Sequence, residues 1–167
     1  MDAIEKQKFL EAYDLYAEAI YRHCYFRVYS RERAEDLMQE TFTKAWNYLV
    51  SGTNREVENW RALLYRIATN LVIDYARKKK EMSLEAMLEN QEVVEPHYDG
   101  HKDIERSSSV SEVMRTLKDL PEQDASLFIM RYVDDMQPKE ISEILDISAN
   151  NVSVRLNHIA AKVRKRL

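Results

Sequence analysis

Apolar residues recur at intervals of three and four positions along most of this chain, a spacing that places them on one face of an α-helix. The clearest stripe lies between about Asn59 and Lys79 and consists of Leu64, Ile67, Ala68, Leu71, Val72 and Tyr75. The 167 residues include only two glycines and three prolines, whereas a β-sandwich or barrel needs far more turn-forming residues. The sequence therefore predicts an all-α fold.

The helical spacing is interrupted once over a long stretch. Between Glu81 and Ser109 the sequence contains Pro96, Gly100, three consecutive serines and eight acidic residues against two basic ones. Such a composition is typical of a linker. We therefore predict two small helical domains, residues 1–80 and 110–167, joined by an acidic flexible linker over residues 81–109.

Several classes of protein are disfavoured by what the chain lacks. Gly52 and Gly100 are too few to build the glycine-rich loops of nucleotide-binding folds. A single cysteine, Cys24, permits no intrachain disulfide and fits a reducing compartment. No apolar run has the length of a signal peptide or of a membrane span, which takes roughly 18 residues. We expect a cytoplasmic protein without membrane insertion.

The four histidines give no sign of an active site. His23 and His158 stand alone, while His97 and His101 flank Gly100 within the linker, which disfavours a metal pair on one helix. We therefore expect no catalytic residue, no metal, no cofactor and no enzymatic activity. A redox or metal role for His23 and Cys24 is the less favoured alternative to simple packing in a helix.

Charge is strongly segregated along the chain, although the net charge is only −4. Residues 61–80 hold six basic residues against Asp74, and residues 151–167 hold five basic residues and no acid. Residues 81–135, by contrast, hold 14 acids and five bases. Two basic helices indicate a polyanionic ligand such as nucleic acid. The alternative for each run is a solvated helix C-terminus, where cations suit the helix dipole.

The end of the chain has the layout of a helix-turn-helix. A helix over Pro138–Leu145, a short turn and a helix from Ser148 match that motif. In the second helix the apolar face is formed by Val152, Leu156, Ile159 and Val163. The opposite, N-terminal side would face base edges, and its candidates are Asn150, Ser153, Val154, Asn157 and His158. Phosphate contacts are expected from Arg155, Lys162, Arg164 and Lys165. An ordinary helical hairpin with a soluble outer face is the alternative.

The helix that ends near Lys80 carries a second candidate surface. At 100° per residue, Arg66, Asn70 and Arg77 lie within an arc of about 40° opposite the apolar stripe. An amide flanked by two guanidinium groups is suited to a phosphate backbone and one extruded base. A polar surface stripe explains this pattern equally well.

Three blocks of sequence resemble the extracytoplasmic-function (ECF) sigma factors of bacteria. "RERAEDLMQETFTKAW" (31–46) resembles their region 2.2, and "LLYRIATNLVIDYARKKK" (63–80) resembles their regions 2.3 and 2.4. The segment 120–167 resembles their region 4. The three blocks stand in family order and cover nearly the whole chain outside the linker. The resemblance implies a region 2 helical bundle followed by a region 4 helix-turn-helix domain.

The resemblance also implies a function and a set of site residues. The chain would bind core RNA polymerase, recognise the −35 and −10 promoter elements and promote DNA melting. Core docking on the β′ clamp helices would use Asp36, Gln39 and Glu40. Contact with the −10 element and the melted non-template strand would use Tyr65, Arg66, Asn70, Asp74, Arg77 and Lys78. Contact with the duplex −35 element would use Asn150, Ser153, Val154, Arg155, Asn157, His158 and Lys162. Further implied partners are the β flap and an anti-sigma factor.

The chain departs from the family pattern at a few positions. Leu63 stands where many members have Trp, and Trp60 is a candidate to fill the same core space. Asp146 stands where many have a turn glycine, and Asp tolerates a left-handed conformation better than most residues. Ser153 and His158 replace common Lys or Arg residues. We expect weaker electrostatic reading of the −35 element and an unusual promoter sequence.

Two other functions remain open from the residues. A stand-alone helix-turn-helix regulator would bind duplex DNA without polymerase, but it offers no reason for the second, base-capturing helix. A helical scaffold would bind no nucleic acid at all.

The linker has a charge of −6 over residues 81–110. It is suited to a basic RNA channel of the polymerase; the alternative is a plain tether.

Overall fold

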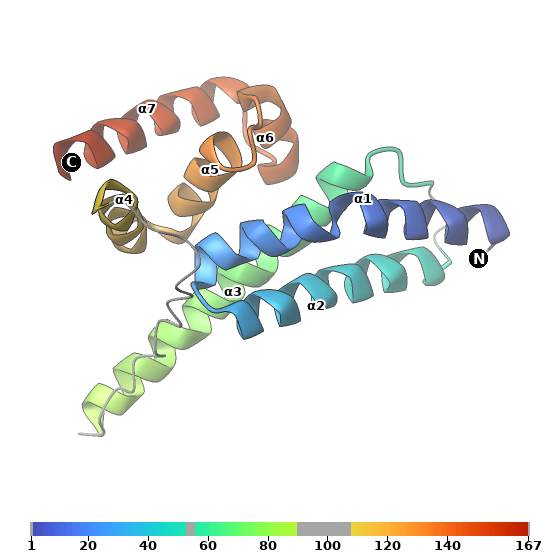
Figure 1. Cartoon of the computed structure of the whole chain (residues 1–167), viewed down its shortest axis with the longest axis horizontal. Coiled ribbons are helices and arrows are strands. Elements are labelled where there is room, and N and C mark those ends of the chain that lie inside the picture. The colour runs from blue at the N-terminus through green and yellow to red at the C-terminus, as the bar shows by residue number, and fades with distance from the viewer. Residues whose placement is uncertain (1, 53–55, 90–107, 167) are drawn as a thin grey trace.

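The computed structural model describes residues 2–52, 56–89 and 108–166. Within these ranges the chain forms helices and no strand, which confirms the predicted all-α fold (Figure 1). The helices are α1 (Ala3–Val28), α2 (Arg31–Val50), α3 (Trp60–Leu88), α4 (Ser108–Asp119), α5 (Glu122–Tyr132), α6 (Pro138–Leu145) and α7 (Ala149–Arg166).

Each of the first three helices begins at a polar side chain that accepts a backbone N–H. Asp2 and Glu5 form a reciprocal capping box at α1, with Glu5 N donating to Asp2 Oδ1 at 2.7 Å. Ser30 caps α2, and Asn59 caps α3 by accepting from Ala62 N at 3.0 Å. These caps satisfy donors that have no partner within the helix, and they fix where each helix starts.

Several joints between helices are made by non-glycine residues with positive φ. Tyr29 (φ 55°) ends α1, Asp135 (φ 55°) lies between α5 and α6, and Asp146 (φ 56°) ends α6. Pro138 opens α6 at its first turn, where the missing N–H costs nothing. The helix start predicted at Pro138 and the short turn predicted after Leu145 are therefore confirmed.

Helices α1, α2 and α3 pack together as the N-terminal domain. One end of this domain is closed by aromatic rings, because Phe9 of α1 meets Trp46 at 5.0 Å and Trp60 at 6.0 Å between ring centroids. These edge-on contacts are typical of a packed aromatic cluster. Trp60 is partly buried and packs against the core at this end of the domain.

Helix α3 is longer than the apolar stripe predicts. It continues past Lys80 to Leu88 and projects from the body of the domain (Figure 1). The exposed fractions of Met82, Met87 and Leu88 are 69%, 65% and 85%. The first eight residues of the predicted linker are thus helical, and residues 90–107 of that linker lie outside the described part of the chain.

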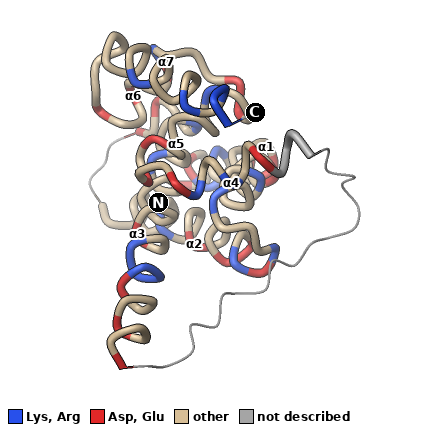
Figure 2. The backbone as a smooth tube through the Cα atoms, turned by 90° about the vertical axis from the view of Figure 1, so that its left-hand side faces the viewer, with Lys and Arg blue, Asp and Glu red and all other residues tan. Residues whose placement is uncertain are grey.

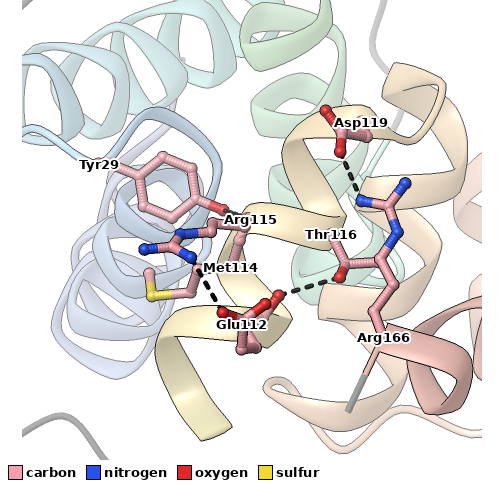
Figure 3. A network of polar contacts seen from close by, with 7 residues as sticks. All are labelled: Tyr29, Glu112, Met114, Arg115, Thr116, Asp119 and Arg166. Carbon is pink, nitrogen blue, oxygen red and sulfur yellow. Dashed lines mark hydrogen bonds and ion pairs between the residues drawn. The ribbon is translucent and has the colours of Figure 1, made fainter. Parts of the chain in front are cut away.

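Helices α4 to α7 form the C-terminal domain. Its core includes Leu127, Ile129, Met130, Ile141 and Ile144, all 2% exposed or less. Helix α4 is held at both sides by polar contacts (Figure 3). The Tyr29 hydroxyl at the end of α1 donates to Met114 O at 3.4 Å, and Arg166 of α7 lies 2.5 Å from Asp119. The C-terminus of α7 is thereby attached to α4.

The two domains pack against each other directly. Helices α1 and α3 both contact α5, and α3 also contacts α6. Buried side chains of the two domains belong to one continuous hydrophobic cluster. The predicted linker is therefore not the sole connection between the domains, and this contact was not evident from the sequence.

In the part of the chain that the structure describes, no helix combines the length and the apolar character that crossing a membrane requires.

Candidate nucleic-acid interface

Helix α7 separates its two faces as the spacing predicts. Val152, Leu156, Ile159 and Val163 are between 0% and 6% exposed, which confirms them as the core face. On the opposite side Asn150, Val154, Asn157, His158 and Lys162 are exposed, and Ser153 is half-buried. The Ser148 hydroxyl caps the helix by accepting from Asn151 N at 3.1 Å. The start of α7 thus presents small polar and apolar side chains to solvent.

The turn before α7 depends on Asp146. Its backbone has φ 56° and ψ 45°, and its N–H donates to Ser142 O. This left-handed geometry closes α6 and lets α7 depart at once, as in a helix-turn-helix. The expectation that Asp replaces the usual glycine here without loss of the turn is confirmed.

Arg155 lies where sequence reasoning did not place it. Its Nε is 3.1 Å from Asp124 Oδ1, and its Nη1 is 3.0 Å from Gln123 Oε1. The guanidinium thus ties α7 to α5 within the same domain, beside an open hollow of about 300 Å³ that His158 and Lys162 also line. In this arrangement Arg155 is engaged by an acid and is not presented to a phosphate.

Most of the predicted −10 residues lie together on the outer face of α3. Asn70, Asp74, Arg77 and Lys78 are all exposed. Basic residues of α3 are drawn in blue in Figure 2, and Arg77 lines an open hollow together with Glu122 and Gln123 of α5. An exposed amide followed two turns later by adjacent cations can contact a base edge and a phosphate on the same strand.

Tyr65 is different, because its side chain is only 1% exposed. Its ring packs edge-on against His23, with 5.3 Å between centroids. Burial and the nearby Asp134 carboxylate raise the pKa of its hydroxyl far above the usual value. In this structure Tyr65 is a core residue, and its assignment to the −10 element stays a prediction.

Arg66 is exposed but already occupied. Its Nη2 donates to Glu143 O at 2.6 Å and its Nε donates to Ile144 O at 3.2 Å. Both acceptors are carbonyls at the C-terminal end of α6, where the helix carries partial negative charge and unsatisfied oxygens. The guanidinium therefore caps a helix of the other domain. Glu143 follows Arg66 by 77 positions and Ile144 follows it by 78, so no local sequence pattern indicates these contacts.

Next to Arg66 the two domains share a set of polar contacts. His23 Nδ1 lies 2.9 Å from Asp134 Oδ2, and both side chains are fully buried. Arg27 Nη2 lies 2.6 Å from Glu122 Oε2. Arg61 lies 2.9 Å from the Glu140 carboxylate, and it also donates to Asp134 O at 3.2 Å. The next residue after His23, Cys24, is fully buried too, and burial together with Asp134 raises the pKa of its thiol to about 12.

Asp36, Gln39 and Glu40 form an exposed row on α2. Positions separated by three and four residues share a helix face, and the buried side of α2 (Ala34, Leu37, Thr41, Phe42 and Ala45) points the other way. Helix α2 packs on α1 and α3 through its buried side, so the row on its opposite side is exposed to solvent and accessible to a partner.

Among the residues that the structure describes, no three His, Cys, Asp or Glu side chains are grouped closely enough to hold a metal ion. His97 and His101 are outside the described residues.

Comparison with known proteins gives matches along most of the chain. The family description "Sigma-70 region 2" matches residues 12–82, and "Sigma-70, region 4" matches residues 111–163. The chain is 31% identical to "ECF RNA polymerase sigma factor SigW" of Bacillus subtilis, over 98% of this chain and 90% of that protein. It is 28% identical to "RNA polymerase sigma factor YlaC" of the same organism, over 94% of this chain and 90% of that protein.

A solved structure shares the fold. The sigma factor RpoE of Bartonella quintana, crystallised with the anti-sigma factor NepR, superposes with a TM-score of 0.69 at 18% identity. The superposition covers 95% of this chain and 96% of that one.

Proposed function

Because this chain belongs to the ECF sigma factors of the sigma-70 family, we propose that its two domains divide promoter recognition between them. It is an alternative sigma factor for transcription initiation. In our proposal α3 holds the −10 element as melted non-template strand, α7 reads the −35 element as duplex, and α2 docks on core RNA polymerase.

The observation that carries the proposal is the presence of two exposed DNA-suited faces in one chain. The α3 face presents Asn70, Arg77 and Lys78, and the α7 face presents Val154, Asn157 and His158. A stand-alone helix-turn-helix regulator accounts for the second face only. The proposed partners are core RNA polymerase, through its β′ clamp helices and β flap, promoter DNA and an anti-sigma factor. A cytoplasmic location follows from the first of these.

Reconstituted transcription separates the alternatives. The purified chain is mixed with bacterial core polymerase and a library of promoter fragments, and the initiated transcripts are sequenced. A sigma factor initiates at a defined subset of fragments. A duplex-binding regulator binds fragments in the absence of core polymerase but starts no transcript. A scaffold neither binds the fragments nor starts a transcript. If no fragment supports initiation that depends on core polymerase, the proposal is contradicted.

Asn157→Ala is expected to weaken discrimination at the −35 element by about tenfold. The exposed Asn157 amide is suited to a bidentate contact with adenine, and one such contact contributes about 1–3 kcal/mol of discrimination. The measurement is run-off transcription from a selected promoter and from its single-base −35 variants. Asn151→Ala, an exposed amide on the same helix, is the matched control. If Asn157→Ala and Asn151→Ala discriminate equally between the selected promoter and its −35 variants, the residues that read the −35 element lie elsewhere on α7.

Glu40→Lys is expected to weaken binding to core polymerase by about tenfold, because it reverses a charge in the exposed α2 row. The measurement is a competition assay with a labelled sigma factor. Glu35→Lys changes the same charge on another exposed side of α2 and serves as the control. If both reversals weaken binding equally, overall charge and not a docking face determines affinity.

A further inference from the structure

One flank of α7 carries a row of basic side chains beside the exposed face of the helix. The row consists of Arg155, His158, Lys162 and Arg166, which follow one another at intervals of three or four residues and therefore share a side of the helix. Such a row can follow the backbone of a nucleic-acid strand, where phosphates are contacted whatever the base. This flank would therefore add affinity for duplex DNA without adding sequence preference.

Both ends of the row are paired with acids of the same domain. At the C-terminal end of α7, Arg166 lies 2.5 Å from Asp119 (Figure 3). At the other end, Arg155 donates to Asp124 Oδ1 from Nε at 3.1 Å and also from Nη2, and its Nη1 donates to Gln123 Oε1 at 3.0 Å. All three nitrogen atoms of the Arg155 guanidinium are thus held by the first turn of α5.

The pair between Arg155 and Asp124 is accessible to water. The two side chains are 26% and 19% exposed, and they border the open hollow of about 300 Å³ between α5 and α7. An ion pair that water reaches contributes little to stability, so a competing anion can displace one partner with a small loss of stability. A phosphate that enters the hollow meets Arg155 together with His158 and Lys162, which also line it.

Keeping one cation paired has different consequences for the two kinds of duplex DNA. A duplex of unrelated sequence is held by phosphate contacts alone, so a guanidinium that stays with Asp124 adds nothing to that affinity. A duplex with the −35 sequence is held in addition through base contacts, which seat the strand against α7 and bring its backbone to the hollow. Specificity is the difference between the two affinities, and it grows when only the second complex recruits Arg155.

We propose that Asp124 is a specificity-determining residue of the C-terminal domain, because its carboxylate withholds Arg155 from DNA until base recognition places a backbone phosphate in the hollow between α5 and α7. The guanidinium then exchanges the carboxylate for the phosphate. This inference rests on the proposed function, because it takes α7 to read duplex DNA.

The alternative is a fixed strut, in which the pair only holds α7 against α5. Removing the charge of Asp124 while keeping the shape of its side chain separates the two. With a fixed strut, Asp124→Asn lowers stability and leaves the affinity for unrelated duplex unchanged or weaker. With the exchange, the same substitution raises that affinity, because Arg155 is released toward the DNA backbone.

The test uses the full chain without polymerase and two fluorescein-labelled duplexes. One has a random sequence, and the other carries the −35 sequence of a promoter selected in the transcription assay. Fluorescence anisotropy gives both affinities over a series of salt concentrations. Glu112→Gln is the matched control, because it removes the same charge from an arginine pair of the same domain, and its partner Arg115 lies on α4.

We expect Asp124→Asn to bind the random duplex about fivefold more tightly at about 0.15 M salt, with a slope of log affinity against log salt that is steeper by about 0.9, as one added phosphate contact gives. The affinity for the −35 duplex should change by less than about twofold, so the ratio of the two affinities falls. The double variant Asp124→Asn/Arg155→Gln should lose the gain, and Glu112→Gln should equal the parent.

Unchanged or weaker binding of the random duplex by folded Asp124→Asn overturns the proposal in favour of the strut. A gain that persists in the double variant, or that Glu112→Gln shares, overturns it as well, because overall charge then accounts for the effect. Should circular dichroism show that Asp124→Asn is unfolded, Gln123→Ala decides. Gln123 is exposed, and loss of its hydrogen bond to Arg155 should also tighten binding of the random duplex, whereas no tightening overturns the exchange.

Failure of this inference is distinguishable from failure of the proposed function, because binding of a random duplex does not depend on transcription. A chain that initiates transcription with core polymerase but shows no gain that depends on Arg155 contradicts the inference alone. A chain that shows the gain but never initiates transcription contradicts the proposed function and leaves the exchange at Arg155 standing.

Discussion

Asn70→Ala is expected to lower promoter-dependent initiation by about 10- to 100-fold. The exposed amide on α3 is the group proposed to hold the extruded base of the −10 element. Losing such a contact costs about 1–3 kcal/mol, and each 1.4 kcal/mol is a factor of ten. The measurement is abortive transcription at a selected promoter with saturating core polymerase, so that docking does not limit the rate.

Two further measurements make this prediction specific. Gln7→Ala removes an exposed amide from α1, far from α3 in sequence, and is expected to leave initiation unchanged. On a template with a pre-melted −10 bubble of altered sequence, the Asn70→Ala defect should shrink, because the parent also loses its base contact there. An equal defect on both templates would indicate that Asn70 acts without reading a base.

Leu64→Ala is expected to lower the free energy of unfolding by about 3 kcal/mol. Leu64 is 0% exposed between the packed helices of the N-terminal domain, and removing a buried leucine side chain loses transfer energy and leaves a cavity. A domain of this size has a total stability of about 5–15 kcal/mol, so the loss is a large share. Urea denaturation followed by circular dichroism measures it.

The neighbouring leucine provides the control. Leu63 is partly exposed and lies outside the hydrophobic cluster, so Leu63→Ala is expected to cost less than about 1 kcal/mol. A comparable loss in both variants would mean that the two leucines contribute equally to the core, against their observed burial.

The features that the sequence predicts are those encoded by local spacing. The buried stripe of α7 follows from the helical period, and the left-handed turn at Asp146 follows from the motif and from the tolerance of Asp. The exposure of Asn70, Arg77 and Asn157 follows in the same way, because each lies opposite an apolar stripe.

The surroundings that the sequence did not predict depend on contacts between distant parts of the chain. His23 and Asp134 are 111 positions apart, and Tyr65, which the family resemblance assigns to the −10 element, is buried with its ring packed edge-on against His23. Arg66 and Arg155 are basic residues on predicted DNA faces, yet each is engaged by another helix. A helical period shows which side of a helix is polar, but it does not show whether water, DNA or another domain covers that side.

The length of α3 has a consequence for the distance between the two promoter elements. The eight residues that extend it beyond Lys80 advance the helix by about 12 Å, more than three base-pair steps of about 3.4 Å. A helix keeps its length, so Leu88 at the end of α3 lies at a fixed offset from Asn70. With Asn70 as the proposed contact to the −10 element, shortening this arm is expected to shift the preferred number of base pairs in the promoter spacer.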